Sequence, residues 1–269
     1  MDFSRRFGGL ERLYGVVGAQ RICAAHVAVV GVGGVGSWAV EALARSGVGR
    51  LTLIDLDHVS ESNINRQVHA LDVTLGQAKV QAMRERIAQI NPDCQVTCIE
   101  EFVAPGNWPG MLPAGPHGSP PTAVFAVIDA CDQVQAKTAM AAWAVRSKAP
   151  FISVGAAGGK RHAHLVDIDD LSRTTHDPLL AQLRYRLRKA HGAPREGKKI
   201  GVACVFSREA VMPPDPSSGL PSDAREAYIS DGSLNCHGYG SVVSVTATFG
   251  QCAAGWVMDQ ISKTDAASG

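Results

Sequence analysis

A glycine-rich turn, and an aspartate that follows it along the chain, are the residues of this sequence whose types and spacing suit the binding of a phosphate and a ribose. The turn has the pattern GxGxxG, formed by Gly31, Gly33, Gly34 and Gly36. Such glycines let the backbone approach a phosphate, and the next helix offers unpaired N–H groups to the same anion. Asp55 falls nineteen residues after Gly36, close to the position from which a carboxylate binds ribose hydroxyls. The pattern predicts a nucleotide site, whereas the alternative is a glycine turn needed only for packing.

Polar residues further along indicate which nucleotide the site holds. The segment from Ser62 to Gln67 contains Asn63, Asn65 and Arg66, and Lys79 follows Arg66 by thirteen residues. A guanidinium and an ammonium near the phosphates suit adenylyl transfer, because charge on the departing pyrophosphate must be neutralised. Hydride transfer needs an apolar nicotinamide pocket instead. The cation pair therefore favours ATP, and a nicotinamide-dependent oxidoreductase is the alternative class.

Three further carboxylates are expected at the ends of strands. Asp57 follows the strand that ends near Asp55, and Asp129 and Asp132 follow a later one. Their oxygen atoms are ligands of the kind that Mg²⁺ prefers when it bridges phosphates. Asp132 also precedes a predicted helix at 133–148, so capping of that helix is its alternative role.

Strands that alternate with helices are expected to position these residues. Short apolar runs predict strands at 26–31, 51–55, 95–99, 123–129 and 150–154, and apolar residues three or four apart predict helices at 35–46 and 76–90. This alternation predicts an α/β fold with a Rossmann-like, doubly wound, mostly parallel sheet, extended by C-terminal strands and helices. We expect a single domain over residues 1–269, with its nucleotide-binding half at about 20–155. Pro- and Gly-rich clusters at 105–121 and 212–222 predict surface loops.

Composition and charge narrow the classes of protein. A hydrophobic content of 45% with 19% charged residues predicts a globular chain with a substantial core. The net charge of +1 gives no global attraction to nucleic acid. Seven Lys and Arg residues nevertheless cluster between positions 184 and 199. This cluster is either a phosphate-binding patch or a solvated helix face.

Cysteine usage and hydropathy bear on location and metal content. Seven cysteines without a CxxC pair predict reduced thiols in a cytoplasmic protein. Cys94 and Cys98 have no second pair with which to complete a four-ligand site, so no structural zinc is expected. The N-terminal residues lack the apolar core of a secretory signal. The stretch Gly238 to Met258 has no charged residue and predicts a buried core element, with membrane contact as the alternative.

Seven stretches give the chain a resemblance to a known family. They are RFGGLERLYG, VAVVGVGGVGSWAVEALARSGVGRLTLIDLDHV, NINRQVHAL, GQAKVQAMRERIAQINP, VIDACD, GVACVFSREA and GYGSVVSVTATFG. On these stretches, which extend over nearly the whole length, the chain resembles the tRNA threonylcarbamoyladenosine dehydratases. That family is related to the molybdopterin and thiamin adenylyltransferases within the ubiquitin-activating-enzyme-like, ThiF-type superfamily. The first stretch and the last two are the more specific to the dehydratases.

The resemblance implies ATP- and Mg²⁺-dependent dehydration of a modified adenosine in tRNA, through an acyl-adenylate. It also implies residue roles: Gly34 against the phosphates, Asp55 on the ribose, Asn63 and Arg66 on the phosphates, Lys79 in transfer and Asp132 on Mg²⁺. It implies a homodimer as well, in which an N-terminal arginine of the partner subunit reaches the γ-phosphate. Arg6 and Arg12 fit that role equally.

Other activities and partners remain as alternatives. The main one is activation of the C-terminus of a sulfur-carrier or ubiquitin-like protein, and a sulfur-transfer protein is a candidate partner. The zinc-binding CxxC pairs of sulfur-carrier adenylyltransferases are missing, which favours the dehydratase branch. Cys204 and Cys236 match cysteines of related dehydratases, and we expect buried free thiols in preference to a thioester. A scaffold without catalysis is disfavoured, because it leaves the charged residues at the strand ends unexplained.

Overall fold

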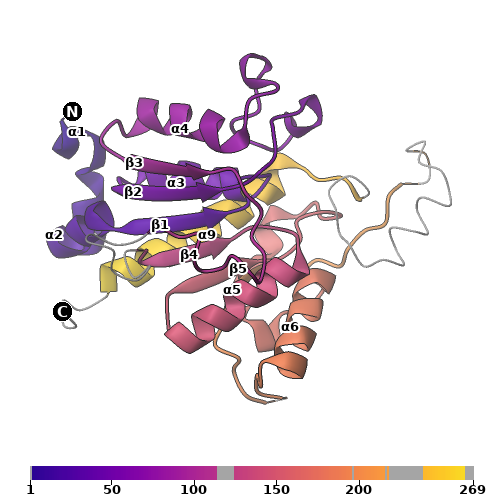
Figure 1. The fold of residues 1–269 in the computed structure, drawn as a ribbon. Coiled ribbons are helices and arrows are strands. Elements are labelled where there is room, and N and C mark those ends of the chain that lie inside the picture. The colour runs from indigo at the N-terminus through magenta and orange to yellow at the C-terminus, as the bar shows by residue number, and fades with distance from the viewer. Residues whose placement is uncertain (1, 114–123, 196, 216, 218–238, 264–269) are drawn as a thin grey trace.

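A seven-stranded sheet forms the centre of the computed structural model, which describes residues 2–113, 124–195, 197–215, 217 and 239–263. The strands are β1 (His26–Val30), β2 (Arg50–Ile54), β3 (Gln95–Ile99), β4 (Ala126–Asp129), β5 (Phe151–Val154), β6 (Val166–Asp170) and β7 (Ala203–Ser207). Their order is β3-β2-β1-β4-β5-β7-β6, and every neighbouring pair is parallel except β6 with β7 (Figure 1). The predicted α/β fold with a mostly parallel sheet is therefore confirmed.

Helices cover both faces of this sheet. They are α1 (Phe3–Phe7), α2 (Gly9–Ala24), α3 (Gly36–Arg45), α4 (Lys79–Ile90), α5 (Val134–Ser147), α6 (Pro178–Ala190) and α9 (Val243–Lys263). Alternate residues of β1 serve the two faces, as expected of a buried strand. Val27 and Val29 pack with α3, α4 and α9, whereas Ala28 and Val30 pack with α5 and α6. Because β1 is buried on both faces of the sheet, its sequence is a nearly continuous run of apolar residues.

Strands β6 and β7, which form the antiparallel pair at one edge of the sheet, were not among the predicted strands. Helix α6 was not among the predicted helices. The sequence of β6 is VDIDD, which is too acidic to give the apolar signal of a buried strand. Helix α6 does carry a start signal, because Asp177 accepts a hydrogen bond from Leu180 N and Pro178 occupies the first turn. The basic cluster therefore begins on a helix. Both predicted surface loops, 105–121 and 212–222, lie partly outside the described residues.

Helix α9 accounts for the uncharged C-terminal stretch. Val245, Phe249, Ala253 and Val257 are buried in the core on the α3 side of the sheet. Gly250 allows the close approach to α3, because a Cβ there would meet Val35 O at 2.5 Å and Ala39 N at 2.8 Å. The prediction of a buried core element is thus confirmed for the described part of the stretch. Among all the residues that the structure describes, no helix is long and apolar enough to cross a membrane.

A buried ion pair joins the end of β4 to helix α5. Lys137 Nζ lies 3.0 Å from Asp129 Oδ2, and both side chains are fully buried. The same ammonium donates to Val154 O at 2.7 Å and to Ser153 Oγ at 3.3 Å. Burial disfavours the ammonium, but Asp129 outweighs it and raises the pKa of Lys137 above its usual value. The pair fixes the loop after β4 relative to β5.

Replacing Lys137 with Met is expected to lower the free energy of unfolding by about 3–5 kcal/mol, because an uncompensated carboxylate would remain in the core. Chemical denaturation monitored by circular dichroism measures the change. The double variant Lys137→Met with Asp129→Asn is expected to recover part of the loss, since the second charge is gone. A single variant as stable as wild type would contradict this role for the pair.

Candidate active site

A cavity of about 290 Å³ opens beyond the carboxyl ends of four strands. Val30 and Ile54 end β1 and β2, and Ala130 and Gly155 follow β4 and β5; all four residues line the cavity. The chain leaves β1 in one direction to β2 and β3, and the other strands lie on the opposite side. The cavity therefore occupies the switch point at which open α/β sheets bind ligands.

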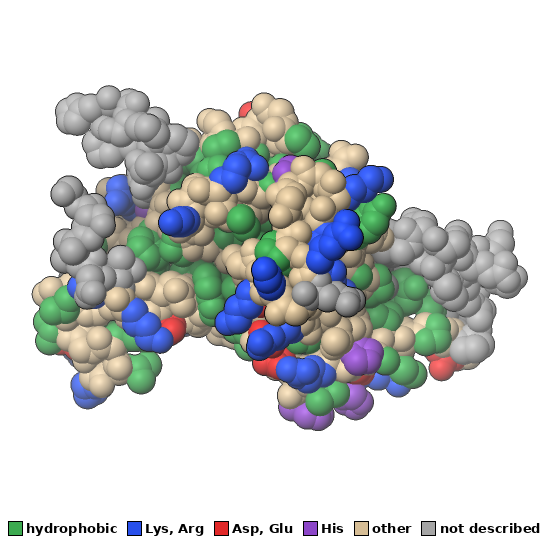
Figure 2. All heavy atoms as spheres, turned by 90° about the horizontal axis from the view of Figure 1, so that it is seen from below, with side chains coloured by type: hydrophobic (Ala, Val, Ile, Leu, Met, Phe, Trp, Pro, Cys, Tyr) green, Lys and Arg blue, Asp and Glu red, His purple; other side chains and the backbone are tan. Residues whose placement is uncertain are grey.

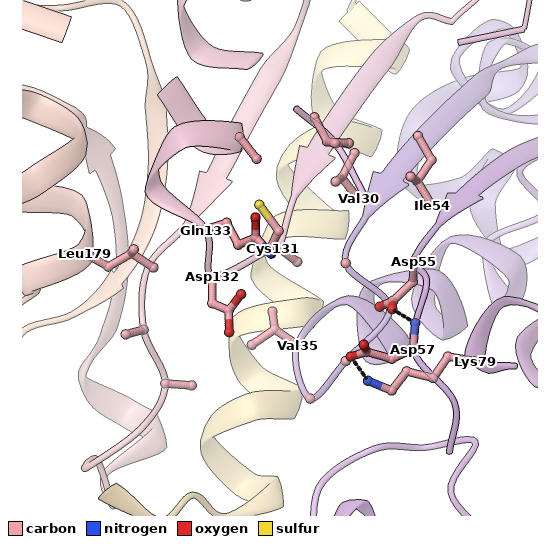
Figure 3. Close-up of a pocket in the computed structure, with 18 of the residues that line it drawn as sticks. Val30, Val35, Ile54, Asp55, Asp57, Lys79, Cys131, Asp132, Gln133 and Leu179 are labelled. Carbon is pink, nitrogen blue, oxygen red and sulfur yellow. Dashed lines mark hydrogen bonds and ion pairs between the residues drawn. The ribbon is translucent and has the colours of Figure 1, made fainter. Parts of the chain in front are cut away.

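The structure brings nine of the predicted site residues together around this cavity. They are Gly31, Gly33, Gly34, Asp55, Asp57, Asn63, Arg66, Lys79 and Asp132. Six do not line it: Gly36, Ser62, Asn65, Asp129, Arg6 and Arg12. Figure 3 shows Asp132, Cys131 and Gln133 on one side, and Asp55, Asp57 and Lys79 across the cavity from them.

The cavity also has lining residues that the sequence analysis missed. They include Gln67, Glu101, Phe102, Val103, Cys131, Gln133, Leu179, Gln182 and Thr246. Gln67 ends the polar segment from Ser62 to Gln67 that was already expected at the site. Phe102 and Leu179 had no such signal, because their segments contain no recognised motif. Together with Val30 and Ile54 they give the cavity an apolar part that suits the faces of a base.

The four glycines of the turn have two different reasons to be glycine. Gly31 has a φ of 83°, and a Cβ there would lie 2.8 Å from the backbone of Ala130 and Cys131. A Cβ on Gly36 would overlap the carbonyl oxygen of Gly31. Gly33 and Gly34, by contrast, have room for a Cβ and face the cavity. The first two are thus required by the fold, and the other two leave space for a ligand at the start of α3.

Asp55 ties the end of β2 to the glycine turn. Its carboxylate accepts hydrogen bonds from Val32 N at 2.6 Å and Asp57 N at 2.9 Å. Burial raises the pKa of Asp55, opposed by the charge of Lys79 and by these two bonds. A carboxylate can accept about four hydrogen bonds. The carboxylate of Asp55 therefore retains capacity for the hydroxyl groups of a ribose.

Lys79 is a nearly buried ammonium held at the cavity by Asp57. Its side chain is 8% exposed, and its Nζ lies 2.7 Å from Asp57 Oδ2 (Figure 3). The backbone N of Lys79 also donates to Asp57 O, at the start of α4. An ammonium has three donors, so two remain for an anion. Asp57 is thus placed to orient Lys79.

Arg66 is a nearly buried cation that has no ion pair among the described residues. The residue is 8% exposed, and its Nη1 donates to Ser62 O at 2.5 Å and Asn65 Oδ1 at 2.8 Å. No ion pair with a described carboxylate forms, and its buried Nε has no hydrogen-bond partner in that part of the chain. A buried charge without a counter-ion is costly. The arrangement suits an anion bound in the cavity, with Ser62 and Asn65 orienting the guanidinium.

Asp129, the last residue of β4, and Asp132, three residues beyond it, have different environments. Asp132 is exposed at the cavity and forms no hydrogen bond or ion pair with any described residue. The N-cap position of α5 is Gln133, without a capping hydrogen bond from its side chain, so Asp132 does not have the alternative capping role. Asp129, also predicted for the site, does not line the cavity, and its carboxylate accepts hydrogen bonds from Lys137, Ser153 and Cys131.

The donor set around Asp132 is compatible with Mg²⁺ only if a ligand supplies further oxygens. Over the described residues, no group of three His, Cys, Asp or Glu side chains is placed to hold a metal ion. Mg²⁺ is commonly bound through one or two carboxylates together with substrate phosphates and water. One open carboxylate beside an anion pocket fits that mode.

The N-terminal arginines lie away from the cavity of their own chain. Arg6 Nη1 donates to Ile90 O at 2.6 Å, in a depression that Arg45 and Arg86 also line. Arg12 is exposed on α2. Within one chain, neither arginine is brought to the predicted site.

Burial raises the thiol pKa of two cysteines in this part of the sheet, Cys131 and Cys204. Burial raises the pKa of Cys131 well above its usual value, and its Sγ contacts Asp129 Oδ1 at 3.1 Å. Burial likewise raises the pKa of Cys204, which is fully buried in β7. The prediction of a buried free cysteine is confirmed for Cys204, whereas Cys236 lies outside the described residues.

His69 lies close to the cationic side of the site and is held neutral. It is 1% exposed, and neither ring nitrogen has a hydrogen-bond partner among the described residues. Burial, and then the charges of Lys79 and Arg86, lower its pKa from 6.5 to about 4. Between these two values the unfolded chain binds the proton and the folded chain does not, so stability falls as pH falls.

We therefore expect the pH dependence of stability to be weaker in His69→Leu than in wild type. Each pKa unit corresponds to about 1.4 kcal/mol, so His69 is expected to cost wild type about 3 kcal/mol between pH 7 and pH 4. Urea unfolding of both proteins at the two pH values measures this difference. Parallel losses of stability in the two proteins would show that His69 is not the titrating group.

The fold and this site define the chain as a nucleotide-binding α/β protein of the adenylylating type. The family model described as "ThiF family" matches residues 4–267. The tRNA threonylcarbamoyladenosine dehydratase of Escherichia coli is 44% identical over 91% of this chain and 89% of its own length. The enzyme of that name from Haemophilus influenzae is 40% identical over 97% and 95%. The chain therefore belongs to the ThiF family, in the group of tRNA threonylcarbamoyladenosine dehydratases.

A solved structure gives the same relationship. The E. coli dehydratase TcdA, determined in complex with ATP, matches with a TM-score of 0.82 and 41% identity. The match covers 97% of this chain and 96% of the other. The likeness thus extends over the sheet and the helices on both of its faces.

Proposed function

We propose that this chain catalyses the ATP-dependent dehydration of N6-threonylcarbamoyladenosine beside the anticodon of tRNA. The threonyl carboxylate attacks the α-phosphorus of ATP, so that a P–O bond forms and pyrophosphate leaves. The carbamoyl group then closes onto the activated carbonyl carbon, and AMP leaves. One carboxylate oxygen departs in AMP and the carbamoyl group loses a proton. The modified adenosine thereby loses the elements of one water and becomes cyclic.

The residues of the cavity divide this work by their chemistry. Asp55 binds the ribose of ATP, and the N–H groups at Gly33 and Gly34 face its phosphates. Arg66 and Lys79 stabilise the charge that develops as pyrophosphate leaves. Asp132 holds Mg²⁺, which supplies further neutralisation of phosphate charge when it is bound.

The buried guanidinium of Arg66 is the observation that carries the proposal. Among the described residues, its Nε has no hydrogen-bond partner and no carboxylate pairs with the guanidinium. A hydride-transfer site has little use for the pair of Arg66 and Lys79, whereas adenylyl transfer must neutralise the pyrophosphate as it leaves. The similarity to named dehydratases supports the modified nucleoside as substrate in preference to the C-terminus of a carrier protein.

Dimerisation and a cytoplasmic location belong to the same proposal. Helix α2 exposes Leu13, Val16 and Val17, with exposed fractions of 74%, 56% and 58%. Such an apolar face suits contact with a second copy, from which Arg6 or Arg12 reaches the γ-phosphate. Free cysteines throughout the described residues fit a reducing compartment.

Mass spectrometry of tRNA nucleosides tests the reaction. Protein, ATP, Mg²⁺ and tRNA that carries the threonylcarbamoyl group are incubated, and the tRNA is then digested. We expect the modified nucleoside to lose the mass of one water only when ATP is present. An unchanged nucleoside, with AMP formed only when a carrier protein is added, would support the carrier-activating alternative.

A further inference from the structure

A second depression, of about 670 Å³, lies along helices α5 and α6. We call it the α5–α6 groove. Its lining residues come from α5, from α6 with the adjoining His191, and from the segment 105–109. None of them has a role in the reaction proposed above.

The groove presents aromatic rings to solvent. Trp108 and Trp143 meet edge to face, with centroids 5.5 Å apart, and Trp143 is partly exposed. Tyr185 is 60% exposed, and Lys189 Nζ lies 5.6 Å from the centroid of its ring. Exposed rings beside cations are the surfaces on which unpaired bases stack in proteins that bind single-stranded nucleic acids.

The charge of the groove has one sign. It is lined by Arg146, Arg186, Lys189 and His191, and none of the described Asp or Glu residues lines it. The two arginines and the lysine are exposed, and none of the three forms a salt bridge with a described residue. Figure 2 views the molecule from below, the side on which α6 lies in Figure 1, and Lys and Arg side chains gather there. The groove thus complements a polyanion.

Two neighbours in the same basic cluster have structural roles instead. Arg184 Nη1 donates to the carbonyl oxygens of Leu171 and Thr174. Arg188 Nε donates to Pro194 O. Only some of the seven basic residues are therefore free to meet a ligand, and those on α6 that are free line the groove.

The same helices carry the candidate active site and the groove. Ala136 of α5 and Gln182 of α6 line the active-site cavity. Arg186 follows Gln182 by four residues, and one helical turn is about 5.4 Å. A nucleic-acid strand that places one nucleotide in the cavity can therefore place the next nucleotide in the groove.

We propose that the α5–α6 groove binds unpaired nucleotides of an RNA loop, adjacent to the nucleotide that enters the active-site cavity. One base stacks on Tyr185, and the phosphates meet Arg146, Arg186 and Lys189. This inference rests on the proposed function, in which the reacting adenosine lies in the anticodon loop. An unpaired loop fits better than a duplex, because bases inside a duplex are already stacked on each other.

Replacing Tyr185 tests the stacking. Fluorescence anisotropy with an anticodon stem-loop RNA is expected to show affinity about tenfold lower for Tyr185→Ala, since one stacked base is lost. Tyr185→Phe keeps the ring and is expected to bind as wild type does. Affinity for a blunt RNA duplex of the same length is expected to be equal for all three proteins. Because Tyr185 is exposed, the thermal unfolding midpoint should not change.

Charge variants test the phosphate contacts. For Arg186→Gln the slope of log affinity against log salt is expected to fall by about 0.7, the value for one phosphate of a single strand. Arg84→Gln, an exposed change of equal charge on α4, is expected to leave the slope unchanged. Equal effects of the two substitutions would mean non-specific attraction and would overturn the site.

The outcomes separate this inference from the proposed function. If wild type dehydrates tRNA but Tyr185→Ala keeps the wild-type KM and stem-loop affinity, the groove inference fails alone. Equal losses of stem-loop and duplex affinity also overturn it, because stacking would not be involved. If wild type does not dehydrate tRNA but Tyr185→Ala still loses stem-loop affinity selectively, the groove stands and the proposed function fails.

Discussion

Lys79→Ala is expected to lower the rate of ATP–pyrophosphate exchange about 100-fold or more, the usual cost of removing one group that stabilises transition-state charge. Lys79 meets the condition for such an effect, because its ammonium is nearly buried and held at the cavity by Asp57. ATP affinity is expected to fall much less than the rate, since the glycine turn, Asp55 and Arg66 remain. Radiolabelled pyrophosphate exchange measures the rate, and isothermal titration calorimetry measures the affinity.

Lys263→Ala is the matched control, because Lys263 is exposed at the end of α9 and pairs only with Asp259 among the described residues. It is expected to keep the wild-type rate. Exchange at the wild-type rate in Lys79→Ala would remove Lys79 from the transfer step. A rate loss matched by an equal loss of ATP affinity would assign Lys79 to binding alone.

Asp132→Asn is expected to require a much higher Mg²⁺ concentration for activity and to lose about 100-fold in rate at limiting Mg²⁺. The physical reason is that Asp132 offers the open carboxylate of the loop after β4, while Asp129 is committed to Lys137. A titration of exchange rate with Mg²⁺ measures the shift. Asp93→Asn, an exposed change of equal charge, is the control.

The variant Asp129→Asn distinguishes the role of Asp129 from that of Asp132. It is expected to lower the free energy of unfolding, because it leaves the buried ammonium of Lys137 without a full counter-charge. Its Mg²⁺ requirement is expected to stay near that of wild type. Identical Mg²⁺ curves for Asp132→Asn and wild type would place the metal elsewhere.

Local sequence was enough to predict the strand, turn and strand on which much of the site is built. The apolar runs of β1 and β2, the glycine turn and the carboxylate after β2 lie within thirty residues of each other, from His26 to Asp55. Propensity and backbone sterics determine such features from neighbours along the chain. The parallel sheet and its ligand crevice follow from them.

The direction of individual side chains could not be predicted in the same way. Asp129 and Asp132 are three residues apart, yet one faces Lys137 in the core and the other faces the cavity. Successive residues of a strand face opposite sides. A shift of one position at the end of β4 therefore changes which carboxylate is expected in the core and which is expected at the cavity. The pairing of Lys79 with Asp57 likewise depends on how α4 packs. Strand β6 was missed because its acidic sequence resembles a loop.

The most direct test is a crystal structure of the protein with a non-hydrolysable ATP analogue and Mg²⁺. The ribose should lie on Asp55, and the phosphates should lie between the Gly33–Gly34 turn, Arg66 Nε and Lys79, with the metal on Asp132. A nucleotide bound outside this cavity, or with its phosphates directed away from Arg66, would contradict the account.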